Sequence, residues 1–319
     1  MNKPKVSVIM AAYNSGQYIE ESILSILNQT LKDLELIIVD DCSTDETQKI
    51  IQKYNQLDER VITIRNNINS GIAVSRNNGI RLAKANYIAV MDSDDMAFPD
   101  KLQIQYDFLE QEPYVGAVAS GTQIIDENGT FIKNRIGLTN SDEIKFRILL
   151  KNPYINSSVL FRKKLFEEIG GYSKEYEYSE DYGFYSFLSA KYKLASIPKI
   201  LTKYRQNSQA SVTLGSKSRK IQIENSLKIS SRNINQYMPL ETENVRILVS
   251  AVNQWPVSLN GVLKSVNIYK NLMRRYISAE KLNEEQKKRV TKIYKNDLKR
   301  IFGGCLKNKM PWIYSALRG

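Results

Sequence analysis

The sequence predicts an α/β fold, in which a mostly parallel, Rossmann-like sheet is flanked by helices and followed by an α-helical extension. Two observations carry this prediction. Short apolar runs alternate with helix-patterned segments from Lys5 to Glu110, as in the βαβ units of a parallel sheet. From Ser216 onward, Lys and Arg outnumber Asp and Glu by 21 to 7, against 25 to 27 before it. This asymmetry indicates two units, which we place at residues 1–215 and 216–319.

Four short apolar runs, rich in β-branched residues, predict the strands of the first half of the domain. They are Lys5–Met10, Leu34–Asp40, Val61–Arg65 and Tyr87–Asp92. Each run is followed by a segment with helical spacing or helix-starting residues. The predicted helices lie around Ile19–Leu27, within Ser43–Tyr54 and Ser70–Ala85, and at Pro99–Glu110.

Later segments complete the domain and then change type. Val115–Asp126 predicts a strand, and a turn follows at Asp126–Gly129. The C-terminal third predicts amphipathic helices, with one broken at Trp255–Pro256 and another ended by Gly303–Gly304. These helices are Lys220–Tyr237, Glu241–Trp255 and Asn283–Gly304.

Composition narrows the class of protein. Two cysteines, Cys42 and Cys305, in 319 residues favour a reduced compartment over a disulfide framework. The N-terminus lacks a signal-peptide pattern and no apolar stretch approaches the roughly 18 residues of a membrane span, so we expect a cytoplasmic protein. The net charge of +12 raises the question of nucleic acid, but no helix-turn-helix, zinc or RNP signature supports such binding. The chain has no histidine, so bases and metal ligands must be other residue types.

Carboxylates crowd the positions directly after two predicted strands. Asp40 and Asp41 follow the second strand, and Asp92, Asp94 and Asp95 follow the fourth. The carboxyl ends of parallel strands open on one edge, where such sheets bind ligands. Because like charges repel and burial strengthens the repulsion, the cluster predicts a hard divalent cation, Mg²⁺ or Mn²⁺, bound with the phosphates of a nucleotide diphosphate. The simpler alternative is that these acids solvate loop ends or cap helices.

Four motifs resemble family 2 glycosyltransferases with the GT-A fold. They are VSVIMAAYNSGQYIEESILSILNQT, ELIIVDDCSTDET, NSGIAVSRNNGI and VMDSDD, in the order and spacing of the family. The resemblance covers roughly Lys5–Ser211. It implies transfer of a sugar from a nucleotide-sugar donor to an acceptor hydroxyl, usually with inversion at the anomeric carbon. It also implies a nucleotide-sugar half at about 1–112 and an acceptor half at about 113–215.

The resemblance assigns donor-binding roles by position. Ala11, Ala12 and Tyr13 would run along the uracil and ribose of the donor, where small residues let the backbone approach and the aromatic ring offers a stacking face. Asp41 would accept a hydrogen bond from the uracil imide N–H, or Asp40 would do so if the register shifts by one.

The same resemblance places the diphosphate and metal groups. Arg76 would face the diphosphate or the aspartate cluster, although a surface cation on a helix is the alternative. Asp92–Ser93–Asp94 is the DxD-type motif, with Asp92 nearer the ribose and Asp94 on the metal. Asp95 exchanges roles with Asp94 if the alignment moves by one residue.

The acceptor half has its own matching motifs. Asn156–Tyr172 resembles the strand, helix and Gly-Gly stop of the family, and Gly170 or Gly171 suits a helix end that needs positive φ. The pair Glu180–Asp181 opens a helix and matches the ED motif, in which Asp181 would be the catalytic base and Glu180 would orient the acceptor. The alternative is that both acids favour a helix N-terminus through the macrodipole.

One segment departs from the family pattern. Asn207 stands where many relatives have a histidine that binds metal or phosphate, which weakens the expected metal shell. Arg205 and Ser211 would still reach the diphosphate from a loop at Ser208–Ser218 that closes over the donor.

The basic C-terminal helices, with Tyr, Phe and Trp interleaved, suit an anionic bilayer surface. Such a contact would suit a lipid-linked or cell-envelope acceptor and a protein peripheral to the membrane. A solvated helical bundle or a module for homo-oligomerisation is the alternative.

These features predict a metal-dependent inverting glycosyltransferase. It would move a hexose or an N-acetylhexosamine from a UDP-sugar to a hydroxyl of a bacterial lipopolysaccharide, capsule or wall polymer. The alternative is a non-catalytic nucleotide-sugar-binding or membrane-surface module with a degenerate site. The presence of Asp92, Asp94 and Asp181 favours the enzyme.

Overall fold

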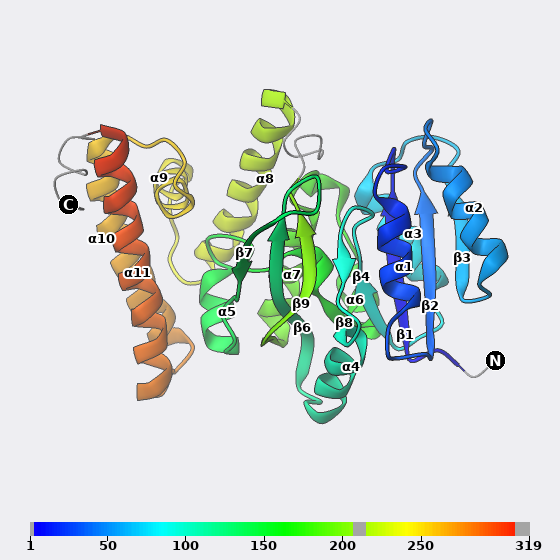
Figure 1. Ribbon diagram of the computed structural model, residues 1–319. Coiled ribbons are helices and arrows are strands. Elements are labelled where there is room, and N and C mark those ends of the chain that lie inside the picture. Colours follow the sequence, from blue (N-terminus) through cyan, green and yellow to red (C-terminus); the bar gives the residue numbers. More distant parts are fainter. Residues whose placement is uncertain (1–2, 207–214, 310–319) are drawn as a thin grey trace. The chain divides into compact units, whose positions relative to one another are not determined.

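A computed structural model of the protein, drawn in Figure 1, describes residues 3–206 and 215–309. The chain divides into two compact units. The first unit comprises residues 1–140 and 153–222, and the second comprises residues 141–152 and 223–319. Asn207 and Ser211, with most of the expected donor loop, lie outside the described residues.

The first half of the sheet is parallel, as the alternating pattern predicts. β1 (Val6–Ala12) pairs with β2 (Leu34–Asp40) on one side and β4 (Tyr87–Val90) on the other, and β2 pairs with β3 (Val61–Arg65). β1, β2 and β4 are apolar and almost wholly buried, which suits strands covered on both faces. Their carboxyl ends share one edge, so the loops after β1, β2 and β4 meet there.

Helices cover both faces of this parallel half, as Figure 1 shows. α1 (Ile19–Leu27) and α2 (Thr47–Leu57) share a core with one set of alternating strand residues. α3 (Ile72–Leu82) packs on β1 and β2 from the opposite face, because successive strand residues point to opposite sides. Its backbone comes so close at Gly79 that a Cβ atom there would lie 2.8 Å from Cγ2 of Ile9.

A second half extends the sheet beyond β4 and makes it mixed. β8 (Leu160–Arg162) is antiparallel to β4 and to β6 (Val115–Ile125), and β9 (Lys193–Arg205) runs parallel to β6. β5 (Met96–Ala97) pairs with β9, and β7 (Phe131–Arg135) pairs with β6. The described residues thus form one nine-stranded sheet.

The remaining elements of the first unit are short helices and 3₁₀ turns. They are α4 (Lys101–Gln111), η1 (Asn156–Ser158), α6 (Lys163–Ile169), η2 (Lys174–Tyr176) and α7 (Glu180–Lys191). α6 ends at Gly170, and both Gly170 and Gly171 have φ near +80°. The predicted Gly-Gly stop is therefore confirmed, since such angles strain any residue with a Cβ.

The second unit is helical and includes residues 141–152, a segment for which the sequence predicted no element. Phe146 of that segment stacks on Tyr269 with ring centroids 5.9 Å apart. Arg147 forms an ion pair with Asp297 at 2.6 Å, and the Tyr269 hydroxyl donates to the same carboxylate. The helices are α5 (Ser141–Arg147), α8 (Gly215–Asn235), which begins in the first unit, α9 (Thr242–Asn253), α10 (Leu259–Ala279) and α11 (Glu284–Lys309).

Two predictions near the C-terminal unit were wrong, and one is confirmed. α11 continues through Gly303–Gly304, because a helical glycine costs only about 1 kcal/mol and does not by itself end a helix. Residues 215–218 of the expected donor loop are the first turn of α8. The predicted break at Trp255–Pro256 is confirmed by the left-handed Gln254 that ends α9. Within the described residues, no helix has the length and apolar character to span a bilayer.

The substitution Gly79→Val tests the close packing of α3 on the sheet. Ile9 and Val39 already lie 2.8 and 3.1 Å from the position of a Cβ atom, so a branched side chain must displace them. We expect a loss of about 2–3 kcal/mol of unfolding free energy in urea denaturation. Gly137→Val is the control, because nothing lies within 4 Å of a Cβ atom there. Equal losses in the two variants would contradict this packing.

Candidate active site

The loops after β1, β2 and β4 are joined to one another at the carboxyl edge of the sheet. Ala12 is paired in register with Asp40, and the backbone N–H of Asp41 donates to the Ala12 carbonyl at 2.8 Å. Ser15 and Ser93 share a hydrogen bond of 2.7 Å between their hydroxyls. The edge that the sequence predicts from strand order is therefore a continuous rim in the structure.

The rim begins with a small-residue segment and an exposed aromatic ring. Ala11 and Ala12 are the last residues of β1, and Ala12 is buried. Tyr13 follows with 49% of its surface exposed, and Asn14 turns the chain with φ of +47°. The Tyr13 ring is thus accessible to a planar ligand.

The two acids after β2 are both buried and both have protein partners. Asp41 accepts from the Asn66 amide at 2.7 Å and from the backbone N–H groups of Ser70 and Gly71 at 2.9 and 2.8 Å. Asp40 forms an ion pair with Arg65 at 3.0 Å. Asp41 therefore orders the loop before α3, whereas Asp40 is bound by a different partner, Arg65.

A buried arginine joins the two sides of the rim. Arg76 on α3 donates through Nη2 to Asp92 and through Nη1 to Glu180, both at 2.6 Å. The arginine is 3% exposed, and its guanidinium carbon lies 5.6 Å from the centre of the Tyr172 ring. Burial opposes the charge, but Asp92 and Glu180 raise the Arg76 pKa above its ordinary value. The sequence expectation that Arg76 faces the aspartate cluster thus agrees with its contacts.

A buried lysine lies beside the loop Asp92–Asp95, which we call the carboxylate loop. Lys101, the first residue of α4, is fully buried and donates to the carbonyl of Ser157. The Ser157 hydroxyl in turn accepts from the backbone N–H of Asp92 at 3.0 Å. Burial lowers the Lys101 pKa to about 7, an effect that Asp95 and Asp92 oppose. This lysine and serine were missed from the sequence, because Lys101 belongs to no motif and Ser157 has no assigned role in the Asn156–Tyr172 motif.

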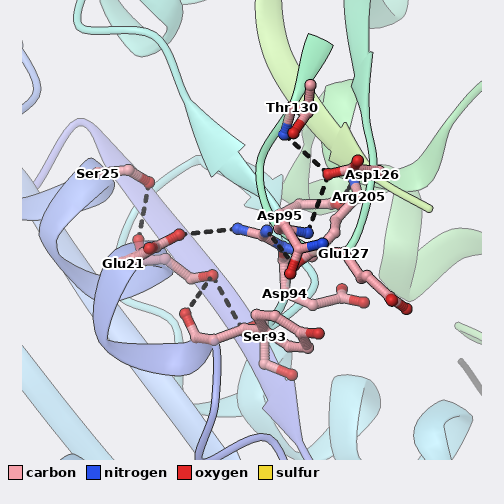
Figure 2. A network of polar contacts seen from close by, with 12 residues as sticks. Glu21, Ser25, Ser93, Asp94, Asp95, Asp126, Glu127, Thr130 and Arg205 are labelled. Atoms are coloured by element: carbon pink, nitrogen blue, oxygen red, sulfur yellow. Dashed lines mark hydrogen bonds and ion pairs between the residues drawn. The ribbon is translucent and has the colours of Figure 1, made fainter. Parts of the chain in front are cut away.

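Arg205 at the end of β9 ties the carboxylate loop to the rest of the unit (Figure 2). Its backbone N–H donates to Asp95 at 2.8 Å, and its Nε donates to the Asp94 carbonyl at 3.0 Å. Nη1 donates to the Glu127 carbonyl and Nη2 to the Glu21 carboxylate. All three guanidinium nitrogens thus have protein acceptors, so Arg205 supports the loop, and its expected contact with the diphosphate stays a prediction.

These cations correct the electrostatic argument made from the sequence. From the sequence, a divalent ion is the main charge that balances the carboxylates, whereas in the structure Arg76, Lys101 and Arg205 already lie beside them. Charge still remains in excess at two positions. Burial and the charge of Asp92 raise the Asp94 pKa to about 6, and burial with the charges of Asp94 and Asp92 raises the Asp95 pKa well above its usual value.

The donor set fits a hard divalent cation through two residues. Asp92 and Asp94 stay partly exposed, whereas Asp95 is fully buried. Mg²⁺ and Mn²⁺ take carboxylate oxygens and commonly need only one or two when phosphates complete the shell. Within the described part of the chain, no cluster of three or more Asp, Glu, Cys or His forms a metal site. A cation here would therefore depend on a ligand for its other bonds.

The acidic pair at the start of α7, Glu180 and Asp181, lies across Arg76 from Asp92. Asp181 is partly exposed, and its carboxylate accepts from the Tyr182 backbone N–H at 2.6 Å. Burial of the carboxyl group and the charge of Glu180 raise the Asp181 pKa to about 7. Glu180 is 5% exposed, and its Oε2 has no hydrogen-bond partner among the described residues. The pair thus offers one carboxyl group suited to proton exchange near neutral pH and one unsatisfied acceptor.

Comparisons with known proteins match the chain to one family. Residues 7–170 match the family model described as Glycosyl transferase family 2. An uncharacterized glycosyltransferase of Haemophilus influenzae is 34% identical over 295 residues, which is 88% of each chain. Escherichia coli WfaP, a UDP-Glc:alpha-D-GlcNAc-diphosphoundecaprenol beta-1,3-glucosyltransferase, is 46% identical over 107 residues, 34% of this chain and 42% of that protein.

Solved structures agree with the GT-A type of fold. TarS 1–349 of S. aureus, in complex with UDP-GlcNAc, superposes with a TM-score of 0.61 at 19% identity, covering 85% of this chain and 81% of that one. Mannosyltransferase PcManGT of Pyrobaculum calidifontis, in complex with GDP-Man and Mn²⁺, gives 0.58 at 16% identity, covering 98% and 88%. The fold, the family model and the H. influenzae relative agree, and the chain belongs to glycosyltransferase family 2.

Proposed function

We propose that this glycosyltransferase inverts the anomeric carbon as it moves a hexose or N-acetylhexosamine from a UDP-sugar to a hydroxyl of a bacterial cell-envelope glycan. The observation that carries the proposal is the Arg76 bridge, which holds Asp92 and Glu180 within 2.6 Å of one guanidinium. The loop that carries Asp92 and the start of α7 therefore lie on two sides of Arg76. An inverting displacement needs this arrangement, with a base opposite the leaving group.

Three features support UDP as the nucleotide part of the donor. The exposed Tyr13 ring offers a stacking face for a base. Asp41, in the adjoining loop, would accept an imide N–H in addition to the three protein donors that it already binds. The relative WfaP carries UDP-Glc in its name, and TarS binds UDP-GlcNAc. PcManGT binds GDP-Man instead, so the base preference of this chain rests on Asp41 and Tyr13.

We assign Asp92 and Asp94 to a Mn²⁺ or Mg²⁺ ion that accompanies the donor. When bound, the ion would offset the charge of the departing diphosphate. The raised pKa of Asp94 supports the assignment, because a nearby positive charge would relieve the repulsion from Asp92. Asp95, being fully buried, would hold the loop through its bond from the Arg205 backbone.

Asp181 acts in this proposal as the general base. Its carboxylate takes the proton of the acceptor hydroxyl while that oxygen forms a bond to the anomeric carbon and the bond to the diphosphate breaks. A pKa near 7 places this group close to its working pH. Glu180 keeps Oε2 unsatisfied, so it would accept a hydrogen bond from a second hydroxyl and orient the acceptor.

The acceptor side draws on the C-terminal unit and on the relatives. The diphosphoundecaprenol acceptor in the name of WfaP supports a lipid-linked glycan for this chain as well. Residues 216–319 carry 21 basic against 7 acidic side chains, and Leu259 and Leu263 are exposed one turn apart on α10. We therefore propose that the C-terminal helices favour an anionic membrane surface.

Asp94→Ala and Asp181→Ala separate donor binding from chemistry. UDP with Mn²⁺ at a hundred times the dissociation constant should stabilise the wild type by about 2.7 kcal/mol. We expect Asp94→Ala to lose the Mn²⁺-dependent thermal shift, and Asp181→Ala to keep it but release no UDP from UDP-Glc or UDP-GlcNAc. Asp107→Ala, an exposed acid of α4, is the control for both measurements.

Two outcomes would count against this assignment. Normal turnover by Asp181→Ala would remove the base from the mechanism. The wild type could bind the donor but show no turnover toward water or any acceptor, whether or not EDTA is added to the turnover assay. That result would favour the non-catalytic module instead.

The rate of transfer should depend on pH through Asp181. A base works only when deprotonated, so its raised pKa predicts a rate that falls as pH drops below about 7, by roughly tenfold per pH unit. The measurement is kcat/KM from pH 5.5 to 8.5, with thermal unfolding at each pH to show that the fold persists. A flat profile over this range would contradict the role of the carboxylate.

Arg76→Met should destabilise the protein, because it leaves the buried Glu180 without its cation. We expect the free energy of unfolding, measured by urea denaturation, to fall by about 3 kcal/mol. This is less than the largest losses for broken buried ion pairs, because the Asp92 side chain is 28% exposed and water can solvate it. Lys53→Met, which breaks an exposed ion pair with Glu20, should change stability little. Arg76→Met combined with Glu180→Met should lose less than Arg76→Met alone, and a larger loss would show that the bridge is not the cause.

A further inference from the structure

The hairpin of β6 and β7 lies next to the carboxylate loop. Figure 2 shows its turn beside Asp94, Asp95 and Arg205. The turn is held by Asp126, whose carboxylate accepts from the backbone N–H groups two and four residues later at 2.9 and 2.8 Å. The Glu127 carbonyl accepts from Nη1 of Arg205 at 3.0 Å. The same arginine therefore supports the hairpin and the loop of the DxD motif.

The hairpin exposes an apolar and basic strand. All residues of β7 are exposed, and in the described part of the chain β7 pairs with β6 alone. Phe131, Ile132 and Ile136 have 56%, 46% and 56% of their surfaces exposed. Lys133 and Arg135 stand between them, and no acidic residue occurs from residue 128 to 140.

An edge strand with exposed charged side chains alone would be ordinary, because lysine and arginine discourage edge-to-edge pairing. Three large apolar side chains within six positions are not explained in this way. Single exposed apolar residues are common on protein surfaces, but a group of them marks an interaction site. The hairpin therefore has a surface that favours a partner.

The distribution of side chains over the strand selects the kind of partner. The register of β7 against β6 shifts between Phe131 and Lys133. Beyond this bulge, successive residues point to opposite faces, so Lys133 and Arg135 lie on one face and Ile136 on the other. All of β7 is exposed, so both faces of the strand are open. A flat protein surface would cover only one of these faces. A bilayer interface surrounds an inserted edge on both, and its anionic headgroups complement Lys133 and Arg135.

We propose that the β6–β7 hairpin is the surface through which the catalytic unit docks on an anionic lipid bilayer. Its contact brings the Asp92–Asp94 loop to the membrane surface, where the hydroxyl of a lipid-linked glycan is presented. The docking rests on the proposed function only in the identity of that acceptor. Binding to lipid is measured without donor, so the two proposals fail separately.

A local probe tests whether the hairpin touches lipid. The full chain carrying Phe131→Trp is mixed with vesicles of phosphatidylglycerol and phosphatidylethanolamine that contain brominated lipid. We expect quenching beyond that of the wild type, whose own tryptophans are Trp255 and Trp312. Tyr114→Trp is the control, because Tyr114 is 80% exposed and precedes β6 at the opposite end of the strand. Equal quenching in the two variants, or none in Phe131→Trp, would overturn the proposal.

Affinity measurements test the chemistry of the contact. Phe131→Ser with Ile132→Ser, and separately Lys133→Glu, should each weaken cosedimentation with the anionic vesicles about tenfold or more. Leu57→Ser, at a residue 69% exposed on α2, should leave it unchanged. The UDP and Mn²⁺ thermal shift of each hairpin variant shows that its fold and donor site are intact.

Three results would overturn the docking. The hairpin variants could bind anionic vesicles like the wild type, which would assign any lipid affinity to the C-terminal helices. The wild type could bind phosphatidylcholine vesicles equally well, which would remove the role of Lys133. Sedimentation could show that the wild type is a dimer which the serine variant dissociates, with no effect on vesicles, and the strand would then pair with a second copy of this chain.

Discussion

The candidate site depends on one buried guanidinium shared by two carboxylates. Arg76 lies on a helix packed against the parallel strands, and its two ion pairs reach Asp92 after β4 and Glu180 at the start of α7. An uncompensated buried charge costs several kcal/mol, so each carboxylate is strongly held where the arginine can reach it. The position of the Asp92 loop relative to the start of α7 therefore follows from a charge balance rather than from either segment alone.

The protein supplies much of the positive charge that a carboxylate cluster requires. Arg76 faces Asp92, Arg205 holds the backbone of Asp94 and the side chain of Asp95, and Lys101 lies beneath the loop. The fold thus tolerates the cluster without a bound ion. Asp94 and Asp95 remain unbalanced, since burial and the neighbouring aspartates raise the pKa of each. A cation and a diphosphate would complete a partly balanced site rather than rescue an unstable one.

Arg205 connects the site to the surface of the catalytic unit. Its contacts join β9, the DxD loop, α1 and the turn of the β6–β7 hairpin. Because all four contacts are made by one side chain and its backbone, the exposed hairpin is tied directly to Asp94 and Asp95. If the proposed docking holds, an acceptor presented at the hairpin would have a defined position relative to the donor, as an in-line reaction requires.

The sequence by itself determined the order of the first strands and helices, the acids at the strand ends and the Gly-Gly stop, because apolar periodicity and glycine angles are local properties. The family motifs likewise indicated which residue types would meet. Only the tertiary structure decided the partners of those residues. Arg205 reaches Glu21 across 184 positions, and Arg76 reaches Glu180 across 104. Such pairs depend on how helices pack on the sheet, and no local pattern encodes the lysine below the loop or the helical segment between β7 and β8.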